Sequence, residues 1–419
     1  MKNIRLIVLL IGLVNLVGCD RHKEQELSFV EENVTFATRQ MQNMLGKLSA
    51  SNESFPRTSN SKGELVTTSR HDWTPGFFPG ILWYLYELTG DQQWRVSAEE
   101  WTNPLEKQQF MTHSHDVGFV MYCSYGNAYR LAPKDSYKDI LIQSAKSLCT
   151  RYNDTIKAIE SWDQRKAWND IMWNYPVIID NMMNLELLCF ASKITGDSTY
   201  INIAINHANK TLENHFRDDF SSYHVVDYDM ETGRALHRQT CQGYSDNSTW
   251  SRGQAWAVYG YTMMYRETGI EEYLTAAKKF AEYYIAHLPE DLIPLWDFNA
   301  GMDGYIPDGV SYAKQYTNAK MQPRDASATA IVCSALFELG EFSQDKKYTD
   351  VAINMLRSLS SNSYRAQLGG NANFMIMHCT GSLPHKAEID KPLVYADYYF
   401  VEALVKYKRL LETGTIFEQ

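Results

Sequence analysis

The sequence predicts an all-α protein whose helices form six hairpins closed into an (α/α)6 barrel. Apolar residues recur at helical spacing in about twelve segments, whereas strand patterns are sparse. A short turn motif recurs between pairs of these segments. The spacing between successive turns varies widely, whereas an open solenoid of helical repeats, the competing arrangement, has repeats of nearly constant length. A closed barrel therefore accounts better for the pattern.

The N-terminus has the features of an export signal. Lys2 and Arg5 precede an apolar run from Leu6 to Val17, and the run ends in Leu16-Val17-Gly18-Cys19. A charged start, a short apolar stretch and small residues before a cleavage point are typical of a signal peptide. The apolar run is too short to span a membrane comfortably. Its match to a lipoprotein signal is close, and an ordinary secretion signal is the alternative.

This signal divides the chain into three expected parts. Residues 1–18 form the lipoprotein signal peptide, and the polar residues 19–27 form a tether that begins with the lipid-bearing Cys19. Residues 28–419 form one barrel domain. The protein is therefore expected in the periplasm, attached to a membrane only through its N-terminal lipid.

Helices are expected wherever apolar residues follow the helical period. Residues 222–229 and 292–298 are candidates for short strands. The long loops 216–248 and 287–324 would lie at one end of a rigid barrel, where binding sites are usually built. The expected helices are 28–48, 76–89, 94–108, 117–131, 136–152, 176–194, 198–215, 249–268, 271–286, 325–340, 345–360 and 393–411.

The recurring turn has a simple physical reading. A helix ends at a Gly or Pro, a polar residue then caps the next helix, and an aromatic residue packs back over the turn. Each copy therefore predicts one αα-hairpin. The copies run from Gly90 to Trp94, Pro133 to Tyr137, Gly196 to Tyr200, Gly269 to Tyr273 and Gly340 to Tyr348.

Composition narrows the possible partners. The 419-residue chain has a net charge of -10 and no basic run after its N-terminus, so nucleic acid is not expected as a partner. An anionic ligand would need a local cationic pocket. The 27 Tyr and 10 Trp residues fit either sugar stacking or a large helical core, and composition does not separate the two.

The cysteines do not predict a metal site. After Cys19, no pair has the C-x-x-C pattern or the spacing of a zinc site, and several lie in apolar helical runs. Free buried thiols are expected, with one disulfide left open. Neither a metal nor a cofactor is indicated. The six cysteines are Cys123, Cys149, Cys189, Cys241, Cys333 and Cys379.

Asp116 is the first candidate for chemistry. It follows His113-Ser114-His115 at the expected start of a helix. A carboxylate there meets free N–H groups and the positive helix end, so it is either a helix cap or an ionised group that binds sugar hydroxyls. The two histidines lack further metal-ligand spacing.

Asp180 is the second candidate. It falls within the expected helix that has Pro176 in its first turn, among apolar and aromatic residues. Desolvation there would raise the pKa of the carboxyl and suit it to act as a general acid near neutral pH. A core Asp bonded to Asn184 or to a neighbouring helix is the alternative.

Arg252 and a set of aromatic residues complete the candidates. An Arg in the first turn of a helix opposes the helix dipole, so it binds either a substrate carboxylate or a structural partner. His224 lies upstream of Arg252, and taken alone it is interpreted as a structural residue. Trp73 and Trp162 lie near turns and could stack on a sugar, or they could pack in the core.

Five segments together resemble glycoside hydrolase family 88, the unsaturated glucuronyl hydrolases. They occur in the family's order between about residues 70 and 410, and each is weak alone. The segments are Trp73-Thr74-Pro75-Gly76-Phe77-Phe78-Pro79-Gly80, His115-Asp116-Val117-Gly118-Phe119, Ile179-Asp180-Asn181-Met182-Met183-Asn184-Leu185, Ser251-Arg252-Gly253-Gln254-Ala255-Trp256 and Asp390-Lys391-Pro392-Leu393-Val394-Tyr395-Ala396-Asp397-Tyr398-Tyr399.

The resemblance implies an (α/α)6 barrel and an unusual hydrolysis. Family members remove the 4,5-unsaturated glucuronic acid that a polysaccharide lyase leaves at the non-reducing end of glycosaminoglycan fragments. They hydrate its C4=C5 double bond and need no cofactor. The residue matching Asp180 would protonate C4, and the residue matching Asp116 would hold ring hydroxyls. The separation of the two carboxyls therefore carries no information on stereochemistry.

The resemblance also implies a set of substrate-binding residues. His115, His224, Gln242 and Arg252 match the polar set, and Trp73 matches a stacking residue. Trp162 is a less certain match because Trp168 and Trp173 compete with it. In the segment 378–388, the residues that could meet a sulfate are Ser382, His385 and Lys386.

Three other functions remain open at this point. The unsaturated rhamnogalacturonyl hydrolases share the fold and the chemistry but act on pectin fragments. A non-catalytic, lipid-anchored glycan-binding protein would have no use for a desolvated Asp180 near a second carboxylate. A sugar epimerase on the same barrel would use catalytic histidines instead. The sequence does not indicate which glycosaminoglycan is used, which sulfation is accepted, or how many subunits assemble.

Overall fold

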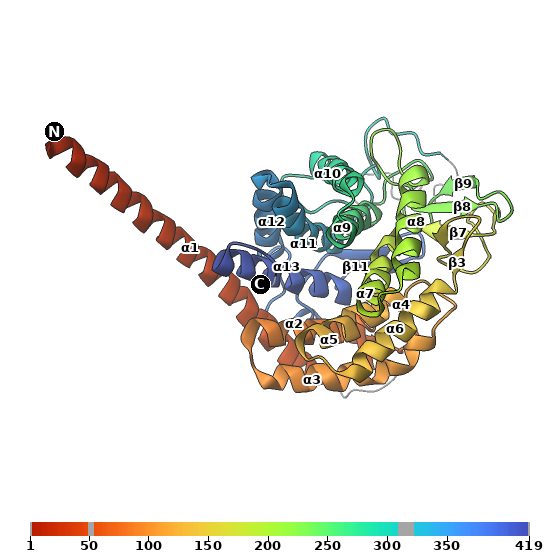
Figure 1. The fold of residues 1–419 in the computed structure, drawn as a ribbon, viewed down its shortest axis with the longest axis horizontal. Coiled ribbons are helices and arrows are strands. Elements are labelled where there is room, and N and C mark those ends of the chain that lie inside the picture. Colours follow the sequence, from red (N-terminus) through yellow and green to blue (C-terminus); the bar gives the residue numbers. More distant parts are fainter. Residues whose placement is uncertain (1, 49–53, 309–321, 418–419) are drawn as a thin grey trace.

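The computed structural model describes residues 2–48, 54–308 and 322–417. Their helices form a double ring, with the N-terminal part of α1 projecting away from it (Figure 1). The inner helices are α2 (Phe77–Thr89), α4 with α5 (Val117–Met121 and Asn127–Leu131), α7 (Leu185–Thr195), α9 (Ser251–Thr268), α11 (Ala326–Ser343) and α13 (Val394–Thr413). The outer helices are α1 (Lys2–Leu45), α3 (Gln92–Thr102), α6 (Asp135–Cys149), α8 (Ser198–Asn214), α10 (Glu271–Ala286) and α12 (Lys346–Leu359).

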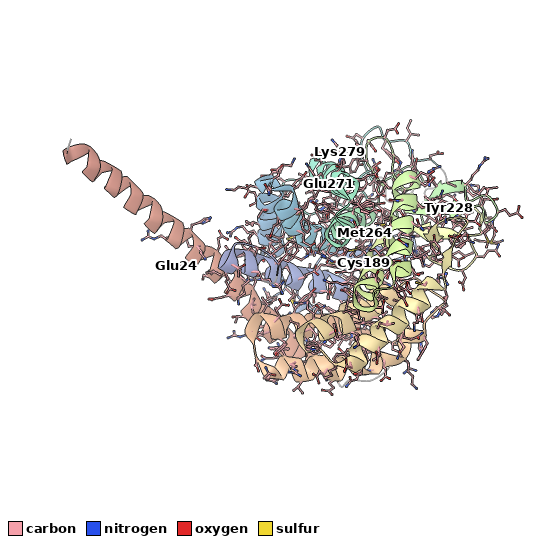
Figure 2. The ribbon with its side chains drawn as sticks, in the orientation of Figure 1. Glu24, Cys189, Tyr228, Met264, Glu271 and Lys279 are labelled. Atoms are coloured by element: carbon pink, nitrogen blue, oxygen red, sulfur yellow. The ribbon has the colours of Figure 1, made fainter. Side chains whose placement is uncertain are left out.

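Burial distinguishes the two rings. Helix α11 is buried without interruption from Ala326 to Gly340, as expected of a helix surrounded by others. The outer helices bury one face only. In Figure 2, Met264 and Cys189 lie inside the barrel, whereas Glu271 on α10 reaches the surface. The predicted (α/α)6 architecture is therefore confirmed.

The ring is closed by the two ends of the chain. Each inner helix packs against the next, and α13 packs against α2 to complete the circle. Five hairpins consist of consecutive helices, namely α2–α3, α4/α5–α6, α7–α8, α9–α10 and α11–α12. The sixth pairs α13 with α1, so the first and last helices of the chain are neighbours.

Most of the predicted turns have the expected chemistry. Gly90, Gly196 and Gly269 end their helices in the left-handed conformation, with φ between 66° and 74°. Asp91 and Asp197 then cap the following helices by accepting hydrogen bonds from backbone N–H groups. The aromatic residues expected over the five turns are buried; they are Trp94, Tyr137, Tyr200, Tyr273 and Tyr348.

The turn predicted at Gly340 is wrong. Helix α11 continues through this glycine to Ser343 and ends at Gln344. A Cβ on Gly340 would lie 2.3 Å from the Thr349 Oγ1 atom, so the glycine permits close packing of α11 on α12. Its role is close approach between helices and not chain reversal.

The first helix begins earlier than predicted. Helix α1 runs continuously from Lys2 to Leu45 instead of starting at residue 28, so the predicted tether over 19–27 is helical. Glu26 accepts hydrogen bonds from Arg357 (2.5 Å) and Tyr407 (2.7 Å), so α1 packs on the barrel from Glu26 onward. No helix in the described part of the chain carries a stretch long and apolar enough to cross a membrane.

Two expected helices are interrupted. The segment predicted as 94–108 ends as α3 at Thr102 and continues as the 3-10 helix η1 (Asn103–Phe110), because Pro104 lacks an N–H for an α-helical bond. The segment predicted as 117–131 contains a π-helical turn, η2 (Tyr122–Gly126), between α4 and α5. Such turns insert one residue and are frequent near functional sites.

The expected helix 176–194 differs most. Pro176–Ile178 is strand β7, which pairs antiparallel with β8 (Val225–Tyr228). A short 3-10 helix, η3 (Ile179–Asn184), follows, and α7 begins only at Leu185. Asp180 therefore lies in the first turn of η3 and not within an α-helix.

Short strands lie at one end of the barrel. The strand expected within 222–229 is present as β8, which also pairs with β9 (Ala235–Gln239). The strand expected at 292–298 is absent, and only single bridges such as Leu295 with Arg324 occur there. The remaining hairpins are β1–β2 (Phe55–Ser59, Leu65–Thr68), β3–β4 (Tyr152–Asn153, Ala158–Ile159), β5–β6 (Arg165–Lys166, Met172–Trp173) and β10–β11 (Cys379–Ser382, Ala387–Lys391).

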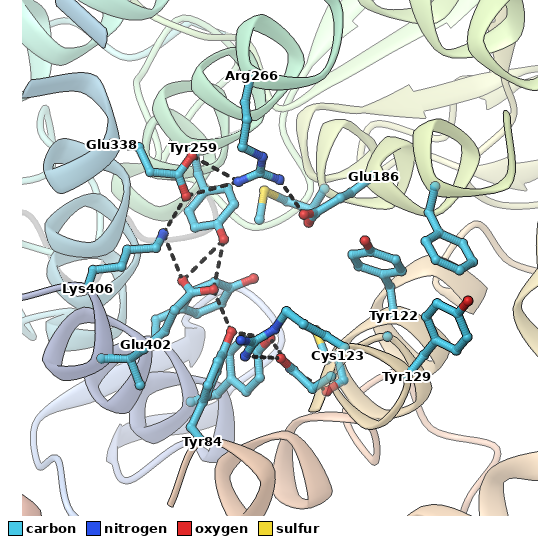
Figure 3. Close-up of a pocket in the computed structure, with 18 of the residues that line it drawn as sticks. Tyr84, Tyr122, Cys123, Tyr129, Glu186, Tyr259, Arg266, Glu338, Glu402 and Lys406 are labelled. Carbon is cyan, nitrogen blue, oxygen red and sulfur yellow. Dashed lines mark hydrogen bonds and ion pairs between the residues drawn. The ribbon is translucent and has the colours of Figure 1, made fainter. Parts of the chain in front are cut away.

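Charged side chains tie the inner helices together at the other end, around a cavity of about 460 Å³ (Figure 3). Arg266 of α9 binds Glu186 of α7 and Glu338 of α11. Lys406 of α13 binds Glu338 at 2.6 Å and lies 3.5 Å from Glu402. The hydroxyls of Tyr84 and Tyr259 donate to Glu402, and Arg130 of α5 pairs with Glu87 of α2. Every inner helix is thus held by this network.

All six cysteines after Cys19 are free thiols, as predicted, and five of them are buried. None lies in a cluster with another thiol that would form a disulfide. They therefore act as small apolar residues in the core.

Candidate active site

The six inner helices begin at the same end of the barrel, opposite the charged network. Trp73, just before α2, contacts Tyr395 at the start of α13, with ring centroids 5.0 Å apart. Arg252, in the first turn of α9, pairs with Asp325, the residue before α11. Helix N-termini carry partial positive charge, so this end of the barrel favours an anionic ligand.

Asp180 is a buried, strongly perturbed carboxyl at this end. Its side chain is 14% exposed, and its Oδ2 atom has no hydrogen-bond partner. Burial raises the pKa of Asp180 to about 7, although the charge of Arg252 opposes part of that rise. Asp180 therefore holds a proton that it can release near neutral pH, as a general acid requires.

His224 presents an N–H group to Asp180. Its Nδ1 atom accepts hydrogen bonds from the backbone N–H groups of Cys241 (3.0 Å) and Gln242 (3.1 Å). Burial lowers the pKa of His224 well below its ordinary value, so the ring is neutral. Because Nδ1 is an acceptor, the single proton lies on Nε2, which is 3.7 Å from Asp180 Oδ2 and has no other partner.

Asp116 is held at the start of α4, but it is not a side-chain cap. Its Oδ2 atom accepts from the Ser114 hydroxyl at 2.5 Å instead of from the helix backbone. Its Oδ1 atom lies 3.4 Å from His115 Nε2. Burial lowers the pKa of His115, and the charge of Asp116 opposes this only in part. The capping interpretation is therefore wrong, although the position at the helix start was predicted.

Asn184 joins the two aspartate segments. Its Oδ1 atom accepts from the Phe119 N–H at 2.8 Å, and its Nδ2 atom lies 3.2 Å from His115 Nδ1. The turn that carries Asp116 is thus bound to η3, which carries Asp180. Gly118 permits this contact, because a Cβ there would lie 2.4 Å from Asn184 Oδ1. The alternative in which Asn184 bonds to Asp180 is not what the structure shows.

Arg252 has a structural partner. It is 1% exposed, and it donates to Asp325 at 2.5 Å and to the carbonyls of Thr380 and Gly381. The guanidinium also stacks 4.5 Å from the Trp250 ring. Of the two partners left open for Arg252, the structure contains the internal carboxylate. Its charge still acts on Asp180, and direct contact with substrate stays a prediction.

The two tryptophans lie on different sides of the site. Trp73 is partly exposed at the edge of an aromatic cluster with Phe77, Phe119 and Tyr395. Trp162 stands edge-on to His224 at 6.1 Å, and it is stacked on Trp173. Its rival Trp173 is 1% exposed and is therefore core. A stacking role for the partly exposed Trp73 and Trp162 stays a prediction.

The remaining predicted residues lie at the rim. Gln242 binds His224 through its backbone, and its half-buried side chain has no hydrogen bond within the described ranges. Ser382 is buried, and its hydroxyl lies 2.6 Å from His385 Nδ1. Lys386 is exposed, with a positive φ of 56°. Nothing in the structure places Lys386 against the two aspartates.

Sequence reasoning missed two residues that shape the site. Asn184 was considered only as a partner of Asp180, and Asp325 was only the start of an expected helix. Asp325 is fully buried and binds Arg252, the Ser327 N–H and the Thr380 N–H. The positive charge of Arg252 opposes the dipole of the helix that it begins, so it required a carboxylate partner. That partner lies 73 residues away in the sequence, and no local pattern could identify it.

Comparison with known proteins agrees with this geometry. The model of glycosyl hydrolase family 88 matches residues 48–410. An unsaturated glucuronyl hydrolase of Formosa agariphila is 45% identical over 98% of this chain and 100% of its own length. An unsaturated chondroitin disaccharide hydrolase of Streptococcus pyogenes is 32% identical over 85% of this chain and 86% of its own.

A solved structure is also similar. The crystal structure of an unsaturated glucuronyl hydrolase specific for heparin superposes with a TM-score of 0.84 at 40% identity. The match covers 91% of this chain and 98% of that one. The family match includes both aspartate segments and the inner helices as far as residue 410 of α13. This chain is therefore a glycoside hydrolase and belongs to glycosyl hydrolase family 88.

Proposed function

We propose that this enzyme removes the 4,5-unsaturated glucuronic acid from the non-reducing end of lyase-generated glycosaminoglycan oligosaccharides by hydrating its C4=C5 double bond. The proposal rests chiefly on Asp180, a carboxyl whose pKa of about 7 leaves it protonated at the start of the reaction. The printed names of the similar proteins support the substrate class.

The reaction balances with these side chains. Asp180 gives its proton to C4, and positive charge develops at C5 next to the ring oxygen. Water adds to C5 and returns a proton to the Asp180 carboxylate, so the catalyst is regenerated. The product at C5 is a hemiketal, which opens and releases the remaining sugar chain.

The neighbouring groups have complementary roles in this proposal. The carboxylate of Asp180, formed after the first step, faces the Nε2–H of His224 at 3.7 Å. The nearby charge of Arg252 also favours that carboxylate. Asp116, held by Ser114 and His115, accepts hydrogen bonds from the ring hydroxyls of the uronate.

Loss of the ultraviolet absorbance of the conjugated double bond tests the proposal. The wild-type protein should consume unsaturated disaccharides from hyaluronan, chondroitin sulfate or heparin. Asp180→Asn should reduce turnover by at least about a thousandfold, because the amide has no proton to give. Calorimetric titration should show that this variant still binds the disaccharides.

Three results would contradict the proposal. Unchanged turnover by Asp180→Asn would remove Asp180 from the chemistry. Activity restricted to unsaturated pectin disaccharides would place the substrate with the rhamnogalacturonyl hydrolases. Binding with no turnover of any substrate would favour the glycan-binding alternative.

We also propose that the enzyme is a periplasmic lipoprotein attached through Cys19. The support is the sequence Leu16-Val17-Gly18-Cys19 after an apolar run, together with a helix that projects from the barrel before Glu26 (Figure 1). Labelled fatty acid should be incorporated into the wild-type protein in cells. It should not be incorporated into Cys19→Ala, which should leave the membrane fraction.

A further inference from the structure

The ring of His115 lies between the two aspartate segments. Its side chain is 1% exposed, and its Nε2 atom lies 3.4 Å from Asp116 Oδ1. Its Nδ1 atom lies 3.2 Å from Asn184 Nδ2. A neutral imidazole carries one proton, so one of these nitrogens is a donor and the other is an acceptor. The position of that proton therefore decides whether the ring donates to Asp116.

The backbone of α4 fixes the orientation of the Asn184 amide. Its Oδ1 atom accepts a hydrogen bond from the Phe119 N–H at 2.8 Å. A backbone N–H can only donate, so the amide oxygen lies on the side of Phe119 and the NH2 group lies on the side of His115. Asn184 is fully buried, and the reversed amide would leave the Phe119 N–H without an acceptor.

Asn184 also replaces the missing cap of α4. Phe119 is the third residue of that helix, and its N–H is one that a cap side chain normally binds. Asp116 stands at the cap position but makes no such bond. Because Asn184 supplies the oxygen from η3, the carboxylate of Asp116 can turn to the Ser114 hydroxyl at 2.5 Å and to the site.

The amide orientation determines the tautomer of His115. Burial lowers the pKa of His115, and the charge of Asp116 opposes this only in part, so the ring is neutral. The Asn181 side chain favours a charged ring, but its Oδ1 atom makes no hydrogen bond. With the Asn184 NH2 group facing Nδ1, that nitrogen is the acceptor, and the proton lies on Nε2, toward Asp116.

We propose that Asn184 is a positioning residue for the reaction, which caps α4 in place of Asp116 and selects the tautomer of His115 that donates to Asp116. This inference rests on the proposed function, in which Asp116 accepts hydrogen bonds from the uronate hydroxyls. The other tautomer would turn the lone pair of Nε2 toward the carboxylate and repel it from that position.

The tautomer can be measured in the ligand-free wild-type protein. In ¹⁵N NMR of protein labelled selectively at histidine, a protonated ring nitrogen and an unprotonated one have clearly different chemical shifts. The signals of His115 are those that disappear in His115→Gln. Near neutral pH we expect its Nε2 atom to be protonated and its Nδ1 atom to be unprotonated. A proton on Nδ1 would overturn the inference, whether or not the enzyme is active.

Asn184→Asp separates capping from the choice of tautomer. The new side chain keeps an oxygen for the Phe119 N–H, but it presents to His115 a carboxylate oxygen, which can only accept. The Nδ1 atom of His115 should therefore become protonated in the same NMR measurement. If Nδ1 stays unprotonated in this variant, Asn184 does not select the tautomer.

The activity of Asn184→Asp relative to wild type should depend on pH. Above the pKa of His115 in the variant, the neutral ring would no longer donate to Asp116. There kcat/KM should be at least about tenfold below wild type, the effect of one hydrogen bond to a charged group. Below that pKa, the ring carries both protons, and the loss should shrink. Besides the new carboxylate, the charged or titratable groups around His115 are Asp116, Arg151 and His207.

Asn127→Asp is the matched control. Asn127 is also a buried asparagine of the α4–α5 segment, and its amide donates to the Cys123 carbonyl at 3.0 Å, away from the aspartates. It should change neither the tautomer of His115 nor the pH dependence of kcat/KM. A loss in Asn184→Asp that is equal at every pH would show a merely structural role and overturn the inference. If that variant does not fold, the wild-type spectrum still decides the tautomer. Wild-type turnover, followed by absorbance, decides the proposed function separately.

Discussion

At the scale of single residues, the site contains two aspartates in different surroundings. Asp180 is desolvated, and one oxygen lacks a partner. Asp116 is bound by a serine hydroxyl and lies near a neutral histidine. In the proposed mechanism these surroundings give similar side chains different tasks, one as proton donor and one as hydrogen-bond acceptor.

The pH dependence of turnover should follow Asp180. In the proposed mechanism its carboxyl must be protonated to give a proton to C4, and its pKa is raised to about 7, so activity is expected to be highest below that value. We expect kcat/KM to fall about tenfold per pH unit above the transition. A pH–rate profile on one unsaturated disaccharide measures this. A profile that rises through neutral pH would contradict the assignment of Asp180 as the acid.

At the scale of secondary-structure elements, sequence reasoning worked where local chemistry decides. Glycine residues at helix ends and aspartate caps predicted the hairpins, and helical periodicity predicted the helices that form both rings. It failed at 176–194, where apolar residues also fit a helix. Pro176–Ile178 is extended because it pairs with β8, a partner 49 residues away that no local pattern reveals.

For the candidate site too, the sequence predicted local properties but not tertiary contacts. The raised pKa of Asp180 was predicted from the cost of burying a carboxyl, and that argument holds whether its segment is an α-helix or a 3-10 helix. The partners of Arg252 and the link through Asn184 depend on tertiary contacts. Residue types alone could not supply those contacts.

The contact between α4 and η3 should be intolerant of added volume. In Gly118→Ala, the new Cβ would meet Asn184 Oδ1 at 2.4 Å and its Cα at 2.6 Å. We expect a loss of about 1–3 kcal/mol in the free energy of unfolding and a lower kcat, because Asp116 and Asp180 would move apart. Denaturant unfolding and initial rates measure the two effects.

Gly46→Ala is the control for that substitution. Its added Cβ would come no closer than 3.4 Å to another atom, so stability and kcat should stay near wild-type values. If Gly118→Ala behaves like this control, the close contact does not position the aspartates.

At the scale of the whole molecule, the two ends of the barrel have different roles. The candidate site lies at the N-terminal ends of the inner helices, and the network around Arg266, Lys406 and Glu402 joins these helices farther along the barrel (Figure 3). This network fixes the spacing of the inner helices, so it also determines how the catalytic ends face one another. Removing one member of such a buried network leaves its partner unpaired.

Glu186 should make the stability of the barrel depend on pH. Burial raises its pKa from 4.5 to about 7, although Arg266 opposes part of the rise. The folded state then holds a proton that the unfolded state releases. The resulting stability is complete below the unfolded pKa and is lost as pH rises through about 7.

Thermal unfolding across this pH range tests the assignment. The wild-type Tm should fall as pH rises from the unfolded to the folded pKa of Glu186, and Glu186→Gln should reduce that fall. Glu213→Gln, at a 67% exposed position, should leave the slope unchanged. Equal slopes in all three proteins would show that Glu186 is ionised in the fold.

The pairing of α1 with α13 also determines when the enzyme can mature. A ribosome makes α1 first, and the helix that covers it emerges only with the last residues of the chain. Until then, five hairpins stand in an open arc with the apolar flank of α2 uncovered. Closure therefore depends on contacts of the greatest sequence separation, which form late and slowly. A chain that stops before α13 would lack the helix that packs on both α11 and α2, so its ring would stay open.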